Sequence, residues 1–270
     1  MSMSFDAPAT VASDERAGSL TRRMLSGAAA ASLYAYRLDE SITFLAHGMT
    51  PDGVLVVAGV PDGMLRVASP GFGIDVRMDL IKQSPDPAVS LVAASVHLLG
   101  QLSWATPSEV EAQIAGGALP ELVEAMIEVP GARLGFVDIE RALLHDMNGA
   151  TVIAPEAISY APPVIEDEFA AFDAIAAYSQ ARLKDLCWAV MVGAVPGQVV
   201  SKPPLPGICP HTADAVFCVD VDPSGVTVMF IGRAETLVVH ACFDVPVTTQ
   251  SQLPGRVAEM MHVAALENCA

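Results

Sequence analysis

Positive charge is scarce in this sequence. Its 270 residues include 14 Lys and Arg against 31 Asp and Glu, which gives a formal net charge of −17 at pH 7. Nucleic-acid binding needs clustered basic side chains to displace counterions from phosphates, and anionic membrane surfaces attract the same side chains. We therefore expect an acidic protein with no nucleic-acid partner and no membrane partner.

Long uninterrupted apolar runs are also missing, although 52% of the residues are hydrophobic. The longest candidate, residues 87–105, is interrupted by His97, Gln101 and several serines, and a transmembrane helix needs about 18 apolar residues or more. Residues 1–18 have neither the basic nor the apolar region of a signal peptide. These absences lead us to expect a cytoplasmic protein, and its hydrophobic content is ample for a core.

Cysteines are few, and all five lie in the last third of the chain. Their odd number and their spacing do not predict a disulfide scaffold. The candidate metal ligands are Cys209, His211, Cys218, His240 and Cys242. Their spacings are not those of a zinc site, and their apolar neighbours favour a packed sheet. We expect no metal site, and whether these five side chains converge stays open.

Strand-like segments are abundant in the first 160 residues. Residues 74–82, IDVRMDLIK, alternate apolar and charged side chains, which is typical of a half-buried strand. Gly100 predicts a bend or bulge, and Asn148-Gly149 predicts a hairpin turn. The predicted strands are 28–38, 41–49, 53–60, 74–82, 88–105 and 133–146, with a further strand after the Asn-Gly turn. An antiparallel barrel closes so many strands without exposed edges.

Three helices accompany these strands. A short helix is predicted over residues 14–27, and residues 1–13 are expected to be disordered. Thr106, Pro107 and Glu109 form a capping box with proline at the first helical position. A second helix follows over residues 119–129.

The region after the Pro- and acid-rich segment 161–168 has a different pattern. It predicts one long helix over residues 168–193, then a proline-rich loop. Three strands at 214–222, 225–232 and 235–245 and a closing helix at 251–268 follow. The chain is therefore predicted to be α+β, with an antiparallel barrel domain at 14–160 and a small α-β-β-β-α domain at 165–268.

This order of elements resembles the HugZ-type haem-utilisation branch of the FMN-binding split-barrel proteins, which are relatives of pyridoxamine-phosphate oxidase. The resemblance is carried by ERAGSLTRRML, FLAHGMTPDGVLVVAGVPDG, VRMDLIK and LLGQLSWATPSEVEA. The tail is similar to the small C-terminal domain of unknown function often fused to these barrels. The resemblance implies a homodimer that binds FMN or haem at the subunit interface, with a role in haem or iron utilisation.

Candidate cofactor-binding residues follow from this resemblance. Split barrels hold the flavin phosphate with Arg or Lys and with Ser or Thr, and the candidates here are Arg66, Ser69, Arg77 and Lys82. Arg77 lies between Asp75 and Asp79, so an exposed strand with salt bridges is the alternative reading of this segment.

Histidines are the candidates for a haem ligand. The helix that carries a histidine in some relatives reads AAYSQARLKDLCWAV here and has none. The remaining candidates include His47, expected in a barrel groove or at a dimer partner. His97 is expected to be a hydrogen-bonded interior histidine, and its functional alternative places it in the barrel's ligand groove with Gln101 on the same face. His145 is the third, expected to be a turn residue together with Asp146.

The sequence leaves the activity and the cofactor open. An enzyme of this class would be a flavin-dependent oxidoreductase or resemble a haem-degrading oxygenase, and no catalytic residue is assigned. The alternative is a cofactor-free binding or regulatory module that acts through a protein partner. The Pro-Asp-Gly segments at 51–53 and 61–63 are interpreted as the two corners of a β-meander.

Overall fold

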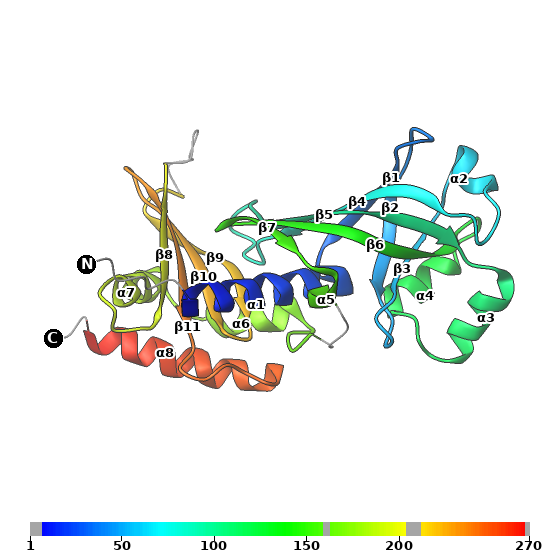
Figure 1. Ribbon diagram of the computed structural model, residues 1–270. Helices are drawn as coiled ribbons and strands as arrows, with labels where there is room; N and C mark the ends of the chain where they lie inside the picture. Colours follow the sequence, from blue (N-terminus) through cyan, green and yellow to red (C-terminus); the bar gives the residue numbers. More distant parts are fainter. Residues whose placement is uncertain (1–6, 159–162, 204–211, 268–270) are drawn as a thin grey trace. The chain divides into compact units, whose positions relative to one another are not determined.

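The computed structural model describes residues 7–158, 163–203 and 212–267 (Figure 1). The chain divides into two compact units. The first comprises Met1–Lys82 and Ala94–Pro163, and the second comprises Gln83–Ala93 and Val164–Ala270. No helix within the described ranges is both long enough and apolar enough to cross a membrane.

The first unit is built on a seven-stranded sheet in the order β3-β2-β1-β4-β5-β6-β7. An additional pairing of β3 with β6 closes the first six strands into an antiparallel barrel. The strands are β1 (Ala30–Ala35), β2 (Glu40–Met49), β3 (Leu55–Gly59), β4 (Ile74–Gln83), β5 (Val92–Trp104), β6 (Arg133–Asp146) and β7 (Gly149–Ile153). The predicted α+β class with a split barrel is confirmed.

Side chains that alternate in direction along each strand fill the interior of the barrel. Every second side chain of β4 is buried, with Ile74, Met78 and Leu80 directed inward. The predicted irregularity at Gly100 is present as a register shift between Leu99 and Gly100 opposite β6. A Cβ atom at this position would collide with the carbonyl oxygen of Asp138, so the close approach of β5 and β6 requires glycine here.

The N-terminal helix α1 (Ala7–Arg23) begins seven residues earlier than predicted, so the expectation of disorder fails for residues 7–13. A short π-helical segment, η1 (Met24–Ala28), follows α1. Gly27 ends it with a φ of 110°, a left-handed value that favours glycine. The helix predicted over residues 14–27 is therefore present, with its helical conformation interrupted at Gly27.

Two helices cover one part of the outside of the barrel. The capping box of α3 (Pro107–Ala115) forms as predicted, because the Thr106 hydroxyl accepts from the Glu109 amide and the Glu109 carboxylate accepts from the Thr106 amide. The next helix, α4 (Glu121–Ile127), buries Val123 in a small apolar cluster with residues on the outer side of β3 and β6. The outer faces of β3 and β6 are therefore partly covered.

The second Pro-Asp-Gly segment does not form a hairpin corner. Residues 61–63 lead into the short helix α2 (Gly63–Val67) instead. The Glu40 carboxylate accepts hydrogen bonds from two amides of its first turn at 2.7 and 2.8 Å. The guanidinium of Arg133 donates to three carbonyls at its C-terminal end. Partners distant in sequence thus stabilise a helix that its own residues do not predict.

The described residues of the second unit form three α-helices on a four-stranded antiparallel sheet in the order β8-β11-β10-β9. Instead of one long helix there are two, because Ser179 caps a new helix and accepts from the Arg182 amide. A strand that was not predicted, β8, forms beside β11. The elements are α6 (Glu168–Ala176), α7 (Gln180–Met191), β8 (Gly197–Lys202), β9 (Ala215–Asp222), β10 (Gly225–Ile231), β11 (Thr236–Cys242) and α8 (Leu253–Glu267).

The segment between β4 and β5 belongs to the second unit. The Ser84 hydroxyl donates to the Cys218 carbonyl at 2.6 Å, and the Asp86 carboxylate accepts from the Cys218 amide at 3.4 Å. These bonds satisfy backbone groups on the outer edge of β9, which is an edge strand of its sheet.

Candidate functional site

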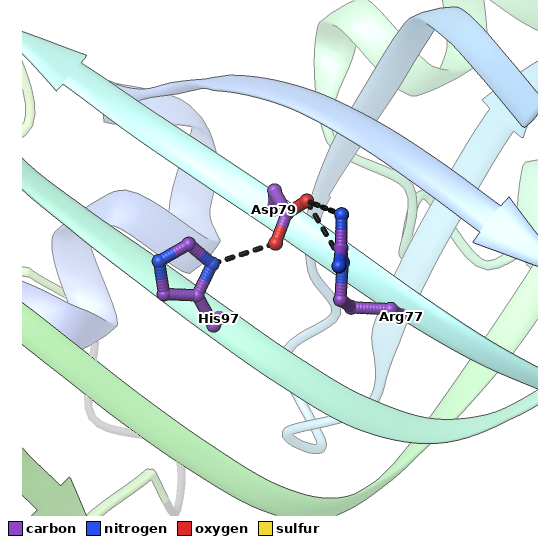
Figure 2. A network of polar contacts seen from close by, with 3 residues as sticks. All are labelled: Arg77, Asp79 and His97. Carbon is purple, nitrogen blue, oxygen red and sulfur yellow. Dashed lines mark hydrogen bonds and ion pairs between the residues drawn. The ribbon is translucent and has the colours of Figure 1, made fainter.

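The outer face of β4, β5 and β6 carries a group of polar side chains that meet across neighbouring strands. Arg77 and Asp79 come from β4 and His97 comes from β5, as Figure 2 shows. His145 comes from β6. We call these four residues the His97 cluster. Arg77, His97 and His145 are exposed, and the apolar cluster around α4 includes none of these four residues.

Asp79 fixes the orientation of the His97 ring. The Nδ1 atom of His97 lies 2.6 Å from Oδ1 of Asp79, and the His97 side chain is 44% exposed (Figure 2). A carboxylate accepts hydrogen bonds, so Nδ1 carries the proton and donates. In the neutral imidazole, the lone pair is then on Nε2, the nitrogen that can bind a metal.

Arg77 shares the same carboxylate. Its Nε and one terminal nitrogen donate to Oδ2 of Asp79 at 3.0 and 2.9 Å. Its guanidinium also lies 6.0 Å from the ring centroid of Tyr34 on β1, within the range of a cation–π contact. The salt-bridged strand proposed as an alternative is present, but Asp75 pairs with Arg37 rather than with Arg77. Arg77 remains half exposed and retains donors for a ligand.

His145 approaches His97 from the neighbouring strand. The two ring centroids are 5.4 Å apart, and the rings are in an edge-to-face arrangement. The expectation that His145 is a turn residue is wrong: it lies within β6, paired opposite Ser95. The turn itself is closed by Asp146, whose carboxylate accepts from the Asn148 and Gly149 amides.

His97 is on the outside of the barrel and not in its interior, which corrects a second expectation. The reason is strand parity: the even-numbered residues of β5, such as Val96 and Leu98, fill the barrel, and the odd-numbered ones face outward. Gln101 is exposed on the same face, as predicted.

Apolar side chains surround the His97 cluster. His97 is paired with Leu143 of β6, and Leu143 is paired with Val152 of β7. Val152 is 79% exposed, and Leu99, two residues after His97, is 41% exposed. The outer face therefore combines one oriented imidazole with uncovered apolar surface.

His47 is located elsewhere. It is buried, and its Nε2 donates to the Met24 carbonyl at 2.8 Å. Burial lowers the pKa of His47, and the hydrogen bond to Met24 opposes this shift. His47 thus holds η1 against the barrel and does not face a groove.

The four candidate phosphate ligands are not brought together on one surface. Arg66 is exposed in α2 and Ser69 is exposed in the following loop. Arg77 is on the outer face of β4, whereas Lys82 is buried and, five residues along the strand, points to the opposite face. Arg77 and Lys82 therefore cannot grip the same phosphate in this arrangement.

The cysteine- and histidine-rich part of the second unit contains no metal-ligand cluster among its described residues. Cys218 is in the core on the helix-covered face of the sheet, with Val239 of β11. His240 follows Val239 and so points to the other face, where its ring lies 3.0 Å from the Thr227 hydroxyl. Burial raises the pKa of the Cys187 thiol to about 12. Cys209 and His211 lie outside the described residues.

Sequence reasoning did not include Asp79 among the site residues. Its signal was the alternation in residues 74–82, which placed Asp75, Arg77 and Asp79 on one face. Its contact with His97 depends on β4 and β5 being neighbours in the sheet, and the alternation does not provide that information.

Comparison with known proteins identifies the fold. No protein-family model matches the chain, and no curated protein matches it. Among solved structures, it is similar to a haem-binding protein from Mycobacterium smegmatis, with a TM-score of 0.51 and 15% identity, covering 94% of this chain and 98% of that chain. A protein of unknown function from Agrobacterium tumefaciens has a TM-score of 0.35 and 15% identity, covering 97% and 100% of the two chains. The first similarity shows a shared fold.

Proposed function

We propose that the outer face of the barrel binds a haem-like iron porphyrin, whose iron would be held by the imidazole of His97. The observation that carries this proposal is the hydrogen bond between His97 Nδ1 and Asp79, which leaves Nε2 as the metal-binding nitrogen. Histidines that bind metals commonly donate their other N–H to a carboxylate in this way, because it fixes the tautomer and raises the basicity of the ligand.

The surroundings of His97 fit the rest of such a ligand. A porphyrin is a flat apolar ring with acidic side groups, so its site needs apolar surface and a cation. Leu99 and Val152 supply exposed apolar surface, and Arg77 supplies a half-exposed guanidinium. The name of the similar Mycobacterium smegmatis structure says that it binds haem. The proposal rests on the His97 cluster.

A second copy of the chain is the partner that we propose for this face. Exposed apolar side chains on several neighbouring strands are typical of an interaction surface. Ile81, Leu99 and Val152 are all between 41% and 79% exposed. A homodimer formed here would shield the ligand from water. Its test is the solution mass by light scattering, with Val152→Glu expected to shift a dimer towards monomer.

A flavin is the less favoured ligand on the same evidence. Its phosphate would need several converging donors, whereas Arg77 already pairs with Asp79 and Lys82 points to the opposite face. An oxidoreductase or oxygenase activity would follow only if a cofactor binds. A cofactor-free module that acts through a protein partner is the remaining alternative.

Absorbance titration of the purified protein with haemin tests the proposal. We expect a saturable Soret band that is lost in His97→Ala. In Asp79→Asn we expect binding to be weakened by about 10- to 100-fold, the usual effect of removing a carboxylate that orients a metal-binding histidine. His262→Ala is the matched control, because His262 is exposed on α8 in the second unit.

Three results discriminate among the alternatives. A Soret band that persists unchanged in His97→Ala would refute His97 as the ligand. Saturable uptake of FMN without uptake of haemin would favour the flavin. A protein that takes up neither would favour the cofactor-free module.

A further inference from the structure

A concave site lies in the barrel unit, formed by other residues than the His97 cluster. It is a cavity of about 310 Å³, which is at the small end of the range for small-molecule sites. Its walls come from the start of β3, the end of β5, the middle of β6 and the short helix α5 (Pro155–Ile158). Val54, Phe136, Ile139 and Ile158 make most of the lining apolar.

Two polar side chains, Ser103 and Asp138, complete the lining. No hydrogen bond or ion pair joins either side chain to another residue in the described ranges, and no Lys, Arg or His lines the cavity. Asp138 is exposed and Ser103 is half-buried. A mostly apolar cavity that is open to solvent and lined by a carboxylate and a hydroxyl favours a ligand that brings a cation and N–H donors of its own.

The backbone that carries these groups is held in place on both sides. Asp138 is paired opposite Gln101 next to the register shift at Gly100, where the absence of a Cβ lets β5 approach β6 closely. On the other wall, the Thr50 hydroxyl accepts from the Val54 amide at 3.0 Å, and the Gly53 amide donates to the Thr50 carbonyl. The Pro-Asp-Gly turn at 51–53 therefore fixes one wall of the cavity.

We propose that this cavity binds a small organic amine with an apolar body. Its ammonium group would bind the Asp138 carboxylate and the Ser103 hydroxyl, and its body would contact Val54, Phe136 and Ile158. The ligand is defined by this chemistry: a protonated amine is bound, while a neutral isostere loses the charge-assisted hydrogen bond and an anion is repelled. This site is independent of the proposed haem site.

Isothermal titration calorimetry with three matched probes tests the proposal: 2-phenylethylamine, 2-phenylethanol and phenylacetate. We expect the amine to bind at least tenfold more tightly than the alcohol, and phenylacetate not to bind. Asp138→Asn is expected to weaken amine binding at least tenfold without changing alcohol binding. Glu140→Gln is the matched control, because Glu140 is an exposed carboxylate of the same strand that does not line the cavity.

A second variant checks the location of the ligand. Val54 is 38% exposed, so Val54→Trp can fill the cavity without burying a large side chain in the core, and it should remove binding of both the amine and the alcohol. Amine binding that survives Val54→Trp or Asp138→Asn would overturn the proposal. Equal affinities for the amine and the alcohol, or no binding of the amine at millimolar concentration, would also overturn it.

Discussion

The two sheets of this protein differ in how their side chains meet water. In the barrel, β4 alternates strictly between buried and more exposed residues. In the second unit, β9, β10 and β11 are buried at nearly every position, on both faces. A sheet with one solvated face can present functional groups to a ligand, whereas a sheet buried on both faces uses its polar groups internally.

Two histidines illustrate this difference. His97 on the barrel is 44% exposed at its side chain, and only one of its ring nitrogens is used in bonding to Asp79. His240 on β11 is 4% exposed and has hydroxyl groups near both ring nitrogens, from Thr227 and Ser224. The same residue type is thus a candidate ligand in one sheet and an internal hydrogen-bonding group in the other.

The largest expected effect is a loss of unfolding free energy when apolar side chains are truncated to alanine on each face of the two sheets. Met229→Ala and Leu237→Ala, on opposite faces of the second sheet, should each lower the free energy of unfolding by about 2–5 kcal/mol, since both residues are buried. In β4, Met78→Ala should have the same cost, whereas Ile81→Ala, at 41% exposure, should cost less than about 1 kcal/mol.

Urea unfolding followed by tryptophan fluorescence provides the measurement. Trp104 reports on the barrel unit and Trp188 on the second unit. The contrast between the sheets would be lost if Ile81→Ala were as destabilising as Met78→Ala, or if only one of the two substitutions in the second sheet were costly.

A smaller loss of stability is expected for the helix α2 of the barrel unit, because side-chain hydrogen bonds and not sheet pairing hold it in place. Arg133→Ala removes three hydrogen bonds to the C-terminal end of α2 and the contact of the guanidinium with the Trp104 ring, 4.7 Å away. We expect a loss of about 1–3 kcal/mol and faster amide hydrogen exchange in residues 63–68. Arg133→Lys should not restore protection, because lysine lacks the planar fork of donors. Unchanged exchange in α2 would show that Arg133 does not hold this helix.

The smallest expected effect is a pH dependence from the buried His47. Burial lowers its pKa in the folded state below the ordinary 6.5, so below about pH 6.5 the unfolded chain takes up a proton that the folded chain does not. Stability from this residue is therefore present at neutral pH and is lost as the pH falls. His47→Gln, which keeps a neutral donor near the Met24 carbonyl, should reduce the slope of unfolding free energy against pH between 7 and 5. Parallel curves for the two proteins would contradict this.

Local patterns predicted much of the barrel. The alternation in residues 74–82 identified β4, the Thr106 capping box identified the start of α3, and Gly100 identified the irregularity in β5. Each of these signals depends on neighbouring residues only, so a single sequence contains it in full.

Elements stabilised from a distance were missed. Two residues distant in sequence hold α2 by hydrogen bonds. Glu40 accepts from Met64, which is 24 residues away, and Arg133 donates to Leu65, which is 68 residues away. The strand β8 is short, follows a helix and precedes a proline-rich segment, and only its pairing with β11 makes it a strand. The break between α6 and α7 has no glycine or proline, and Ser179 alone marks it.

The candidate site was predicted only in its parts. His97, His145 and Arg77 were singled out one by one, but their meeting depends on the order β4-β5-β6 and on the register of each pair. The assignment of His97 to the wrong face of its strand has a related cause. His97 was assigned to the interior because its neighbours are apolar, yet along a strand the neighbours of an outward residue are the ones that fill the core.

The segment 83–93 has a consequence for the order in which the chain acquires its structure. Ser84 is synthesised 134 residues before its partner Cys218, and the strands β5, β6 and β7 of the barrel emerge in between. The second unit is therefore discontinuous in sequence. Residues 83–93, which bond to its edge strand β9, leave the ribosome long before residues 164–270. If the chain were divided between residues 163 and 164, the C-terminal fragment would lack residues 83–93. The edge of β9 would then be open to pairing with other molecules.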